Sequence, residues 1–205
     1  MRPTARTFAA VGAITVLLLT ACTAQVPEPG PTATSAAPTS TPTPTPTPTP
    51  TATGPIDRSD AALGIQFESL PDVTGDARAA LDAYTYFEVE FWRSTTSGAV
   101  SGAIPAVADP AVVAVVQTQV DGNAQKGLKI GGQTQIHLLD VVADAASATV
   151  TTCQDPTKAL VTYEDGTTKT VGDVGGTRLK VVAGMRKEAD LPWQVVTIEN
   201  TGEPC

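Results

Sequence analysis

The sequence predicts an α+β domain over residues 57–205, in which N-terminal helices pack on a curved antiparallel sheet. Two stretches with helical spacing of apolar residues, 74–97 and 109–120, come before every strand-like run. After Gly127 the apolar residues alternate with polar ones, and turn residues separate the runs. That order of helices and then strands is typical of an antiparallel sheet covered by helices.

The first 21 residues predict a secretory signal peptide. Arg2 and Arg6 give the start a positive charge, and residues 8–19 are apolar or small. This apolar stretch is 12 residues long, whereas a membrane-spanning helix needs roughly 20. A charged start, a short apolar stretch and small residues after it together indicate export.

The end of this segment points to a lipid anchor. Leu19, Thr20, Ala21 and Cys22 follow the apolar stretch directly, and this pattern resembles the lipobox of bacterial lipoproteins. The resemblance implies that the Cys22 thiol receives a diacylglyceryl group and becomes the new N-terminus. It also implies attachment to the extracytoplasmic face of the cell membrane. Two acyl chains hold a protein stably, whereas one gives only marginal binding.

A linker rich in threonine and proline follows, over residues 22–56. Thr-Pro pairs repeat through residues 41–50. Each proline fixes its own φ angle and disfavours the helical region for the residue before it. We expect a disordered, extended tether that lifts the domain away from the membrane, with glycosylation of its threonines left open.

The first helix of the domain is predicted to begin at a cap residue, Thr74 or Asp76, and to end at Ser97 and Gly98. Its apolar residues form one wide stripe that is unusually rich in aromatic side chains. Wide side chains on a single helix suit a sheet that curves around it and encloses a pocket. We therefore expect Tyr84, Phe91 and Trp92 in the core or in a pocket wall. Asp109 and Pro110 begin the second helix, as cap and first residue.

The strands are predicted from β-rich runs bounded by turn residues. Glu164, Asp165 and Gly166 form a good hairpin turn between two of these runs. The runs cover residues 133–143, 147–153, 159–163, 167–171, 178–187 and 193–199.

This order resembles the nuclear-transport-factor-2-like superfamily, whose fold is a cone of helices and curved sheet shared with ketosteroid-isomerase-like enzymes. The resemblance rests on the long aromatic helix, the helix that begins at Asp109, the segment 127–130 and the closing segment 193–195. It implies a cone-shaped cavity against the first helix. The domain looks most like the lipid-anchored, extracytoplasmic members of that superfamily.

The cysteines predict a disulfide. Lipidation would use Cys22, which leaves Cys153 and Cys205 as an even pair in an oxidising compartment. We expect them to be bonded at one edge of the sheet, where the bond would fix the C-terminus. A catalytic redox role is disfavoured because the chain has no Cys-x-x-Cys motif.

Two residues are candidates for acid–base chemistry, each with a structural alternative. Glu88 falls inside the apolar stripe of the first helix, where a buried carboxylate would have a raised pKa and could act as a general base. The favoured alternative is that Glu88 reaches solvent. His137 lies in the first predicted strand, residues 133–143, and its favoured role is an exposed or structurally bonded histidine. Glu88 and His137 would make an enzyme site only if both faced one cavity.

Composition and charge narrow the function further. A formal charge of −8 argues against binding to nucleic acid. A single histidine argues against most catalytic zinc sites, and the sequence predicts no metal and no cofactor. The leading hypothesis is a membrane-anchored binding or interaction module of the cell envelope, with an envelope protein or a small apolar ligand as partner. The alternative is a small-molecule isomerase, dehydratase or hydrolase that uses Glu88 or His137, and a solute-binding lipoprotein comes third.

Overall fold

The structure is a computed structural model that describes residues 56–189 and 191–205. The predicted signal peptide, the lipidation site at Cys22 and the linker up to residue 55 lie outside the described residues. The described part corresponds to the domain predicted over residues 57–205.

A five-stranded mixed sheet forms the larger of two sheets. Its strand order is β1-β3-β4-β7-β8. β1 pairs with β3 in parallel, and every other pair in this sheet is antiparallel. The strands are β1 (Ile65–Glu68), β3 (Thr134–Ala143), β4 (Ser147–Asp155), β7 (Leu179–Arg186) and β8 (Gln194–Asn200).

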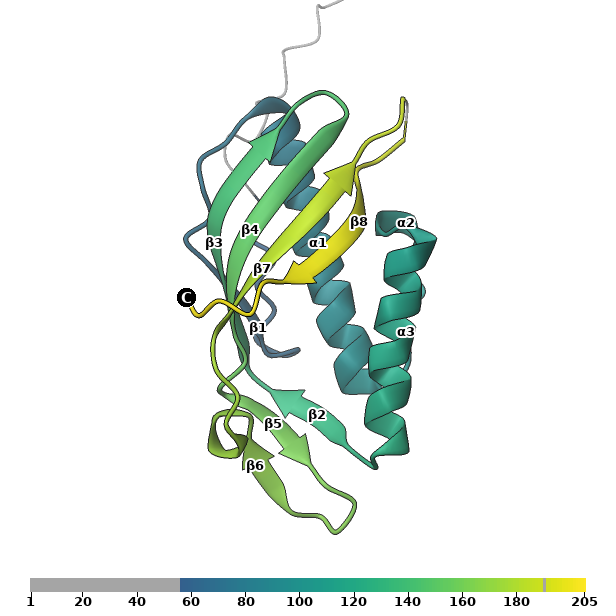
Figure 1. Cartoon of the computed structure of the whole chain (residues 1–205), viewed down its shortest axis with the longest axis vertical. Helices are drawn as coiled ribbons and strands as arrows, with labels where there is room; N and C mark the ends of the chain where they lie inside the picture. The colour runs from purple at the N-terminus through teal and green to yellow at the C-terminus, as the bar shows by residue number, and fades with distance from the viewer. Residues whose placement is uncertain (1–55, 190) are drawn as a thin grey trace, which may run out of the picture. The chain divides into compact units, whose positions relative to one another are not determined.

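A three-stranded antiparallel sheet, in the order β2-β5-β6, lies next to the large sheet (Figure 1). It consists of β2 (Lys129–Gly132), β5 (Ala159–Thr162) and β6 (Thr168–Thr170). The turn predicted at Glu164, Asp165 and Gly166 connects β5 to β6. A single 3₁₀ turn, η1 (Gly172–Val174), follows β6.

The helices begin and end at the predicted signals. α1 (Gly75–Ser97) has Thr74 as its N-cap and ends at Gly98, which adopts the left-handed φ of +73° that glycine favours. α3 (Pro110–Gln125) starts after Asp109, whose side chain accepts a hydrogen bond from the backbone N–H of Ala111. A short helix, α2 (Ile104–Val107), which the sequence analysis did not predict, lies between them.

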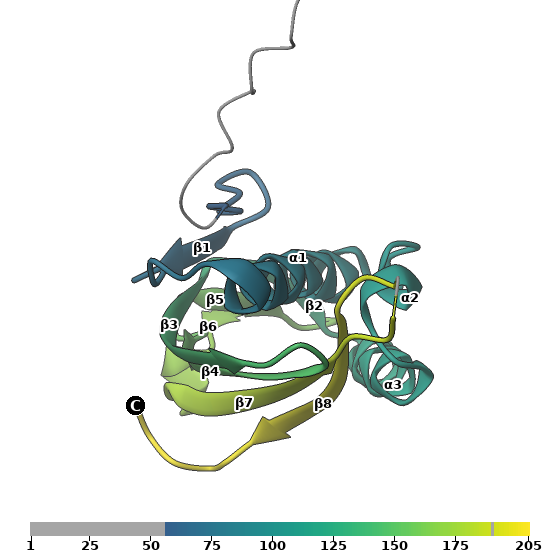
Figure 2. The same cartoon turned by 90° about the horizontal axis from the view of Figure 1, so that it is seen from above.

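The core lies between α1 and one face of the five-stranded sheet. Figure 2 shows α1 lying over β3 and β4, with β1 beside it. The side chains that meet there are buried on both sides of the contact, and they include Leu81, Tyr84 and Phe87 from α1 and Ile136, Leu138, Val150 and Ala183 from the sheet.

The segment before α1 covers a second side of this helix. The indole N–H of Trp92 donates a hydrogen bond to the carbonyl of Leu63 at 2.9 Å. The guanidinium of Arg58 lies 5.2 Å from the centre of the Tyr86 ring and donates to the carbonyl of Asp82. α1 is therefore buried on more than the one stripe that faces the sheet.

The expected architecture is wrong, although the domain is α+β. The prediction was a single curved antiparallel sheet preceded by its helices, as in the cone-shaped nuclear-transport-factor-2-like fold. The structure instead has an open, mixed five-stranded sheet and a separate three-stranded sheet. A strand, β1, also precedes the helices. The physical reason is that β1 pairs in parallel with β3, a contact between segments that lie far apart in the sequence.

The predicted disulfide between Cys153 and Cys205 is confirmed. Cys153 lies on β4, which is the central strand of the sheet and not an edge strand as expected. The bond fixes the C-terminal tail against the sheet face opposite α1. In the chain-entropy model, closing a loop with a sequence separation of 52 residues stabilises a fold by roughly 4 kcal/mol.

Candidate functional site

The candidate site is centred on Glu88, which α1 places against the inner face of the sheet. Glu88 follows Tyr84 by four residues and Leu81 by seven, so the three side chains share one face of the helix. Only 4% of Glu88 is exposed. The favoured expectation that Glu88 reaches solvent is therefore not what the structure shows.

Hydrogen bonds reach only one oxygen of the Glu88 carboxyl group. The Tyr84 hydroxyl donates to Oε1 at 2.5 Å, and the amide Nε2 of Gln154 on β4 donates to the same oxygen at 3.0 Å. The Tyr84 hydroxyl also lies 3.3 Å from Oγ1 of Thr152. Oε2 accepts no hydrogen bond from the described residues, so half of this carboxyl group is open for a further partner.

Burial sets the electrostatics of this group. Loss of contact with water raises the pKa of Glu88 to about 7, because the hydrogen bonds from Tyr84 and Gln154 only partly oppose the effect. Burial, followed by the neighbouring charge of Glu88, raises the pKa of Tyr84 well above its ordinary value. Tyr84 therefore stays protonated, while Glu88 exchanges a proton near neutral pH.

Glu88 lines a cavity of about 220 Å³ between α1, α3 and the two sheets. Glu88 is the only ionisable side chain in the wall within the described part of the chain. Exposed Gln119 on α3 is also part of the wall, so the cavity reaches the surface beside this residue. Most of the other wall residues are apolar, and these are Ile65, Phe91, Trp92, Ile130, Ile136, Pro156, Ala159 and Val171.

The structure places the three predicted aromatic residues around this site. Tyr84 is fully buried in the core and bonds to Glu88. Phe91 and Trp92 lie in the cavity wall. The Phe91 ring also stacks against Phe87, with 6.1 Å between the ring centres.

His137 lies on the other face of the sheet from Glu88. Its neighbour Ile136 points into the core and lines the cavity, and successive residues of a strand point to opposite faces. The His137 Nδ1 atom lies 3.2 Å from Oε2 of Glu68, its register partner on β1. His137 and Glu88 therefore do not share a cavity, and the pair required for the enzyme hypothesis is not formed.

The sequence analysis missed Thr152 and Gln154 as part of the site. Both follow Ala148 and Val150 on the same face of β4, since residues two apart on a strand point the same way. Two polar residues that continue an inward-facing apolar row were the available signal. Gln154 was also missed because the strand was expected to end at Cys153, whereas β4 continues to Asp155.

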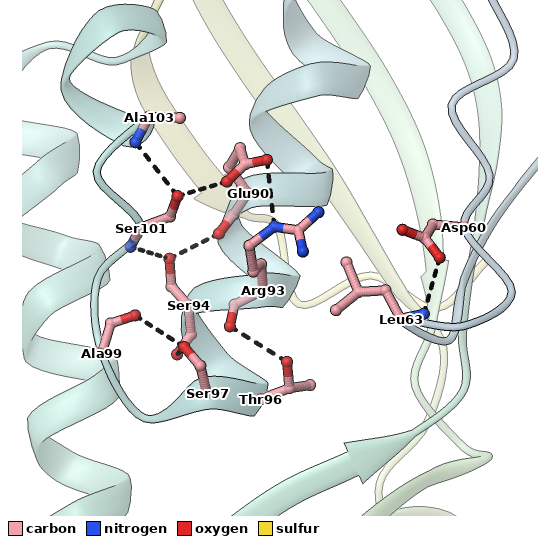
Figure 3. A network of polar contacts seen from close by, with 10 residues as sticks. All are labelled: Asp60, Leu63, Glu90, Arg93, Ser94, Thr96, Ser97, Ala99, Ser101 and Ala103. Atoms are coloured by element: carbon pink, nitrogen blue, oxygen red, sulfur yellow. Dashed lines mark hydrogen bonds and ion pairs between the residues drawn. The ribbon is translucent and has the colours of Figure 1, made fainter.

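A second buried carboxylate, Glu90, is surrounded differently (Figure 3). Its Oε2 accepts a hydrogen bond from the Ser101 hydroxyl at 2.5 Å, and its Oε1 lies 3.4 Å from Nε of Arg93. Ser94 Oγ donates to the Glu90 carbonyl and accepts from the backbone N–H of Ser101. These bonds fix the loop that follows α1, so Glu90 has a structural role.

Other features of the described residues are weaker candidates for a functional site. A larger cavity of about 630 Å³ lies where α1 and α3 end, and its charged wall residues, Lys129 and Glu164, are exposed. The described residues contain no group of side chains arranged to hold a metal ion. Among them, no helix has the length and apolar character needed to cross a membrane.

Comparisons with known proteins give little beyond the geometry. No protein-family model matches the chain, and no curated protein matches it. Among solved structures, the intermembrane space region of the chloroplast protein ARC6 matches with a TM-score of 0.46 and 14% identity, over 62% of this chain and 98% of that one. A conserved protein from Planctomyces limnophilus DSM 3776 matches with a TM-score of 0.33 and 13% identity, over 58% of this chain and 94% of that one. These scores are too low to support an argument about function.

Proposed function

We propose that this chain is a lipid-anchored protein of the cell envelope whose folded domain binds a small, largely apolar ligand. The observation that carries the proposal is the cavity of about 220 Å³, which has mainly apolar walls and one buried carboxylate. Small-molecule sites are typically concave and apolar, with few polar groups that fix orientation. The domain would act as a binding module on the extracytoplasmic face of the membrane.

The sequence supports the location. The charged start, the 12-residue apolar stretch and Leu19-Thr20-Ala21 before Cys22 are the features of a lipoprotein signal peptide. The confirmed disulfide between Cys153 and Cys205 agrees with an oxidising compartment, where such bonds persist.

The anchor is tested by replacing the acceptor cysteine. Cys22→Ala should block lipidation and processing, so the precursor should accumulate at higher mass and lose incorporation of labelled fatty acid. The change Cys153→Ala is the matched control, because it removes a cysteine that the proposal assigns to the folded domain. If Cys22→Ala is processed normally and stays membrane-attached, the lipid anchor is refuted.

The cavity is tested by closing its opening. Gln119→Trp places a large side chain at the surface end of the cavity, and Gln117→Trp makes the same change on another face of α3, where residue 117 lines no part of it. Backbone amide shifts of residues around Glu88 should follow a titration with toluene or benzyl alcohol. We expect saturable shifts that Gln119→Trp weakens and Gln117→Trp leaves unchanged. Equal behaviour of the two variants would refute the binding site.

A second candidate is an enzyme that moves a proton in the same cavity. The observation that favours it is the pKa of about 7 for Glu88, which suits a general base at neutral pH. The position of His137 on the other sheet face counts against the expected acid–base pair. The two candidates separate in Glu88→Gln, which would abolish turnover of a substrate but leave a binding module able to hold an apolar ligand.

A further inference from the structure

We propose that the ligand of this cavity carries a cationic nitrogen that pairs with the open oxygen, Oε2, of Glu88. The inference rests on the proposed binding function and specifies the class of ligand: a small amine with an apolar body. Three features of the cavity support it, namely a carboxylate without a countercharge, an oxygen of that carboxylate without a hydrogen bond, and an aromatic and apolar lining.

The first feature is the missing countercharge. Buried carboxylates in proteins are normally paired with a cation, because an isolated buried charge is very unfavourable. Glu90, on the same helix, has such a cation beside it, because the guanidinium of Arg93 lies 3.4 Å from its Oε1. Glu88 does not: within the described part of the chain, no lysine, arginine or histidine lines its cavity. A ligand cation would supply the charge that the protein omits.

The second feature is the free hydrogen-bonding capacity of the carboxyl group. Tyr84 and Gln154 both donate to Oε1, which holds the group in one orientation without occupying Oε2. Two donors on one oxygen are a rigid support, and the other oxygen can accept from a ligand N–H. Hydrogen bonds between charged partners are roughly twice as strong as neutral ones.

The third feature is the aromatic and apolar lining. Phe91 and Trp92 line the cavity together with Glu88, and the face of an aromatic ring attracts a cation at short range. The remaining wall suits a hydrocarbon body. The volume of about 220 Å³ lies below the range of roughly 300–1,000 Å³ typical of drug-sized ligands, so the ligand is small.

The net negative charge of the protein also favours a cationic ligand. The formal charge is −8, which attracts cations and repels anions at low ionic strength. A carboxylate ligand would also meet Glu88 as a like charge. A neutral alcohol would gain the apolar contacts and one hydrogen bond, but not the ion pair.

Binding of an amine should depend on the protonation of Glu88. Tyr84 on α1 and Gln154 on β4 bond to this carboxyl, and Thr152 on β4 lies beside the Tyr84 hydroxyl. Of these groups only Tyr84 ionises, with a pKa well above its ordinary value. Since burial raises the pKa of Glu88 to about 7, affinity for an ammonium ion should increase as the pH rises through this range. Affinity for a neutral alcohol should change less.

The test compares three probes of similar shape: benzylamine, benzyl alcohol and benzoate. Calorimetric titration at about pH 8, where Glu88 is mostly ionised, should give an affinity for benzylamine about tenfold above that for benzyl alcohol. Benzoate should bind most weakly. Glu88→Gln keeps an oxygen to which Tyr84 and Gln154 can donate. In this variant the affinities for benzylamine and benzyl alcohol should be about equal. Glu199→Gln makes the same change at an exposed position on β8 and should leave the preference intact.

The outcomes separate the inference from the function on which it rests. If benzyl alcohol binds as tightly as benzylamine, or if Glu88→Gln keeps the preference, the cationic ligand is refuted while the apolar binding site stands. If no probe binds and Gln119→Trp behaves like the native protein, the binding site itself is refuted and the inference falls with it.

Discussion

Two glutamates on one helix show what burial does to a carboxylate with and without a partner. Glu88 and Glu90 are two residues apart on α1, and only 4% and 7% of them is exposed. Glu90 faces the loop after the helix, where Ser101 and Arg93 occupy both of its oxygens. Glu88 faces the sheet, where Tyr84 and Gln154 occupy one oxygen and a cavity adjoins the group.

The difference is in the surroundings and not in the degree of burial. A buried carboxylate with a partner at each oxygen stabilises the local structure, as Glu90 does for the loop that holds Ser101. A buried carboxylate with an open oxygen and no countercharge costs free energy in the absence of a ligand. Such a group points to a binding or catalytic site, and this is why we place the function at Glu88.

The largest expected effect comes from removing the Glu88 charge. The pKa of about 7 lies above the ordinary value, so the folded state binds a proton more tightly than the unfolded state. Stability is therefore lost as the pH rises from about 4.5 to about 7. Glu88→Gln should be more stable than the native protein by up to about 3 kcal/mol near pH 8 and no more stable near pH 4.

Urea unfolding at these two pH values measures the difference. Comparing the variant with the native protein at each pH removes the contribution of the other carboxylates, which titrate in both. Equal stability of the two proteins at both pH values would contradict the assignment of Glu88 as a buried, unpaired charge.

The next effect is the loss of the Glu90 network, which should have the opposite sign. Glu90→Ala removes the acceptor of Ser101 and the partner of Arg93, and should destabilise the fold by about 2 kcal/mol. Ser101→Ala should cost less alone, and the two changes should be non-additive by about 1 kcal/mol. A double-mutant cycle in urea measures this coupling. Strict additivity would show that the contact in Figure 3 contributes nothing.

A smaller effect concerns the support of Glu88. Tyr84→Phe removes the hydroxyl that donates to Oε1, and a hydrogen bond to the charged form lowers a carboxyl pKa. The pKa of Glu88 should therefore rise above its value in the native protein, with a stability cost of about 1 kcal/mol. Carbon NMR of the carboxyl group follows the titration. Tyr86→Phe is the control, since Tyr86 lies half-buried under Arg58 and away from Glu88; an equal shift in both variants would argue against the bond.

The smallest effect is expected at Arg93. Its side chain is 46% exposed and its Nε lies 3.4 Å from Glu90, so water screens the pair. Arg93→Gln should change stability by only about 0.5 kcal/mol or less. Thermal unfolding in low and high salt measures it. A loss as large as that of Glu90→Ala would mean that the ion pair, and not Ser101, holds this loop.

The sequence predicted the local elements better than their arrangement. Gly98 and the Asp109-Pro110 pair mark helix ends through their own local preferences, so these ends could be predicted without tertiary contacts. β1 was missed because it has four residues and is held by its parallel pairing with β3. Pairing of distant segments leaves no local signal, and it is this contact that makes the sheet mixed.

β2 was missed for a related reason. Its last two residues, Gly131 and Gly132, are of a type that is rare in strands, but both pair with β5. Gly132 has a φ of +74°, which glycine adopts readily, and a Cβ there would lie 2.8 Å from the backbone nitrogen of Leu160. Glycine is required at this position by a close approach of two strands, which composition alone does not reveal.

Glu88 could be found from the sequence, but its surroundings could not. Its place within the apolar stripe of the helix identified it as unusual. Exposure was favoured because a shift or fraying of the helix would let this carboxylate reach solvent. In the structure the segment before α1 covers another side of the helix, through Trp92, Leu63 and Arg58, and Gln154 reaches Glu88 from a strand 66 residues further on.

The most direct test of the account is the titration of the Glu88 carboxyl group itself. Carbon NMR of the side-chain carboxyl, assigned by its absence in Glu88→Gln, reports the protonation of this one residue across the pH range. The account predicts a midpoint near 7 for the protein without a ligand, and a lower midpoint when benzylamine is bound. A midpoint near the ordinary value of 4.5, unchanged by benzylamine, would contradict the account. The carboxyl group would then be solvated and not buried without a countercharge.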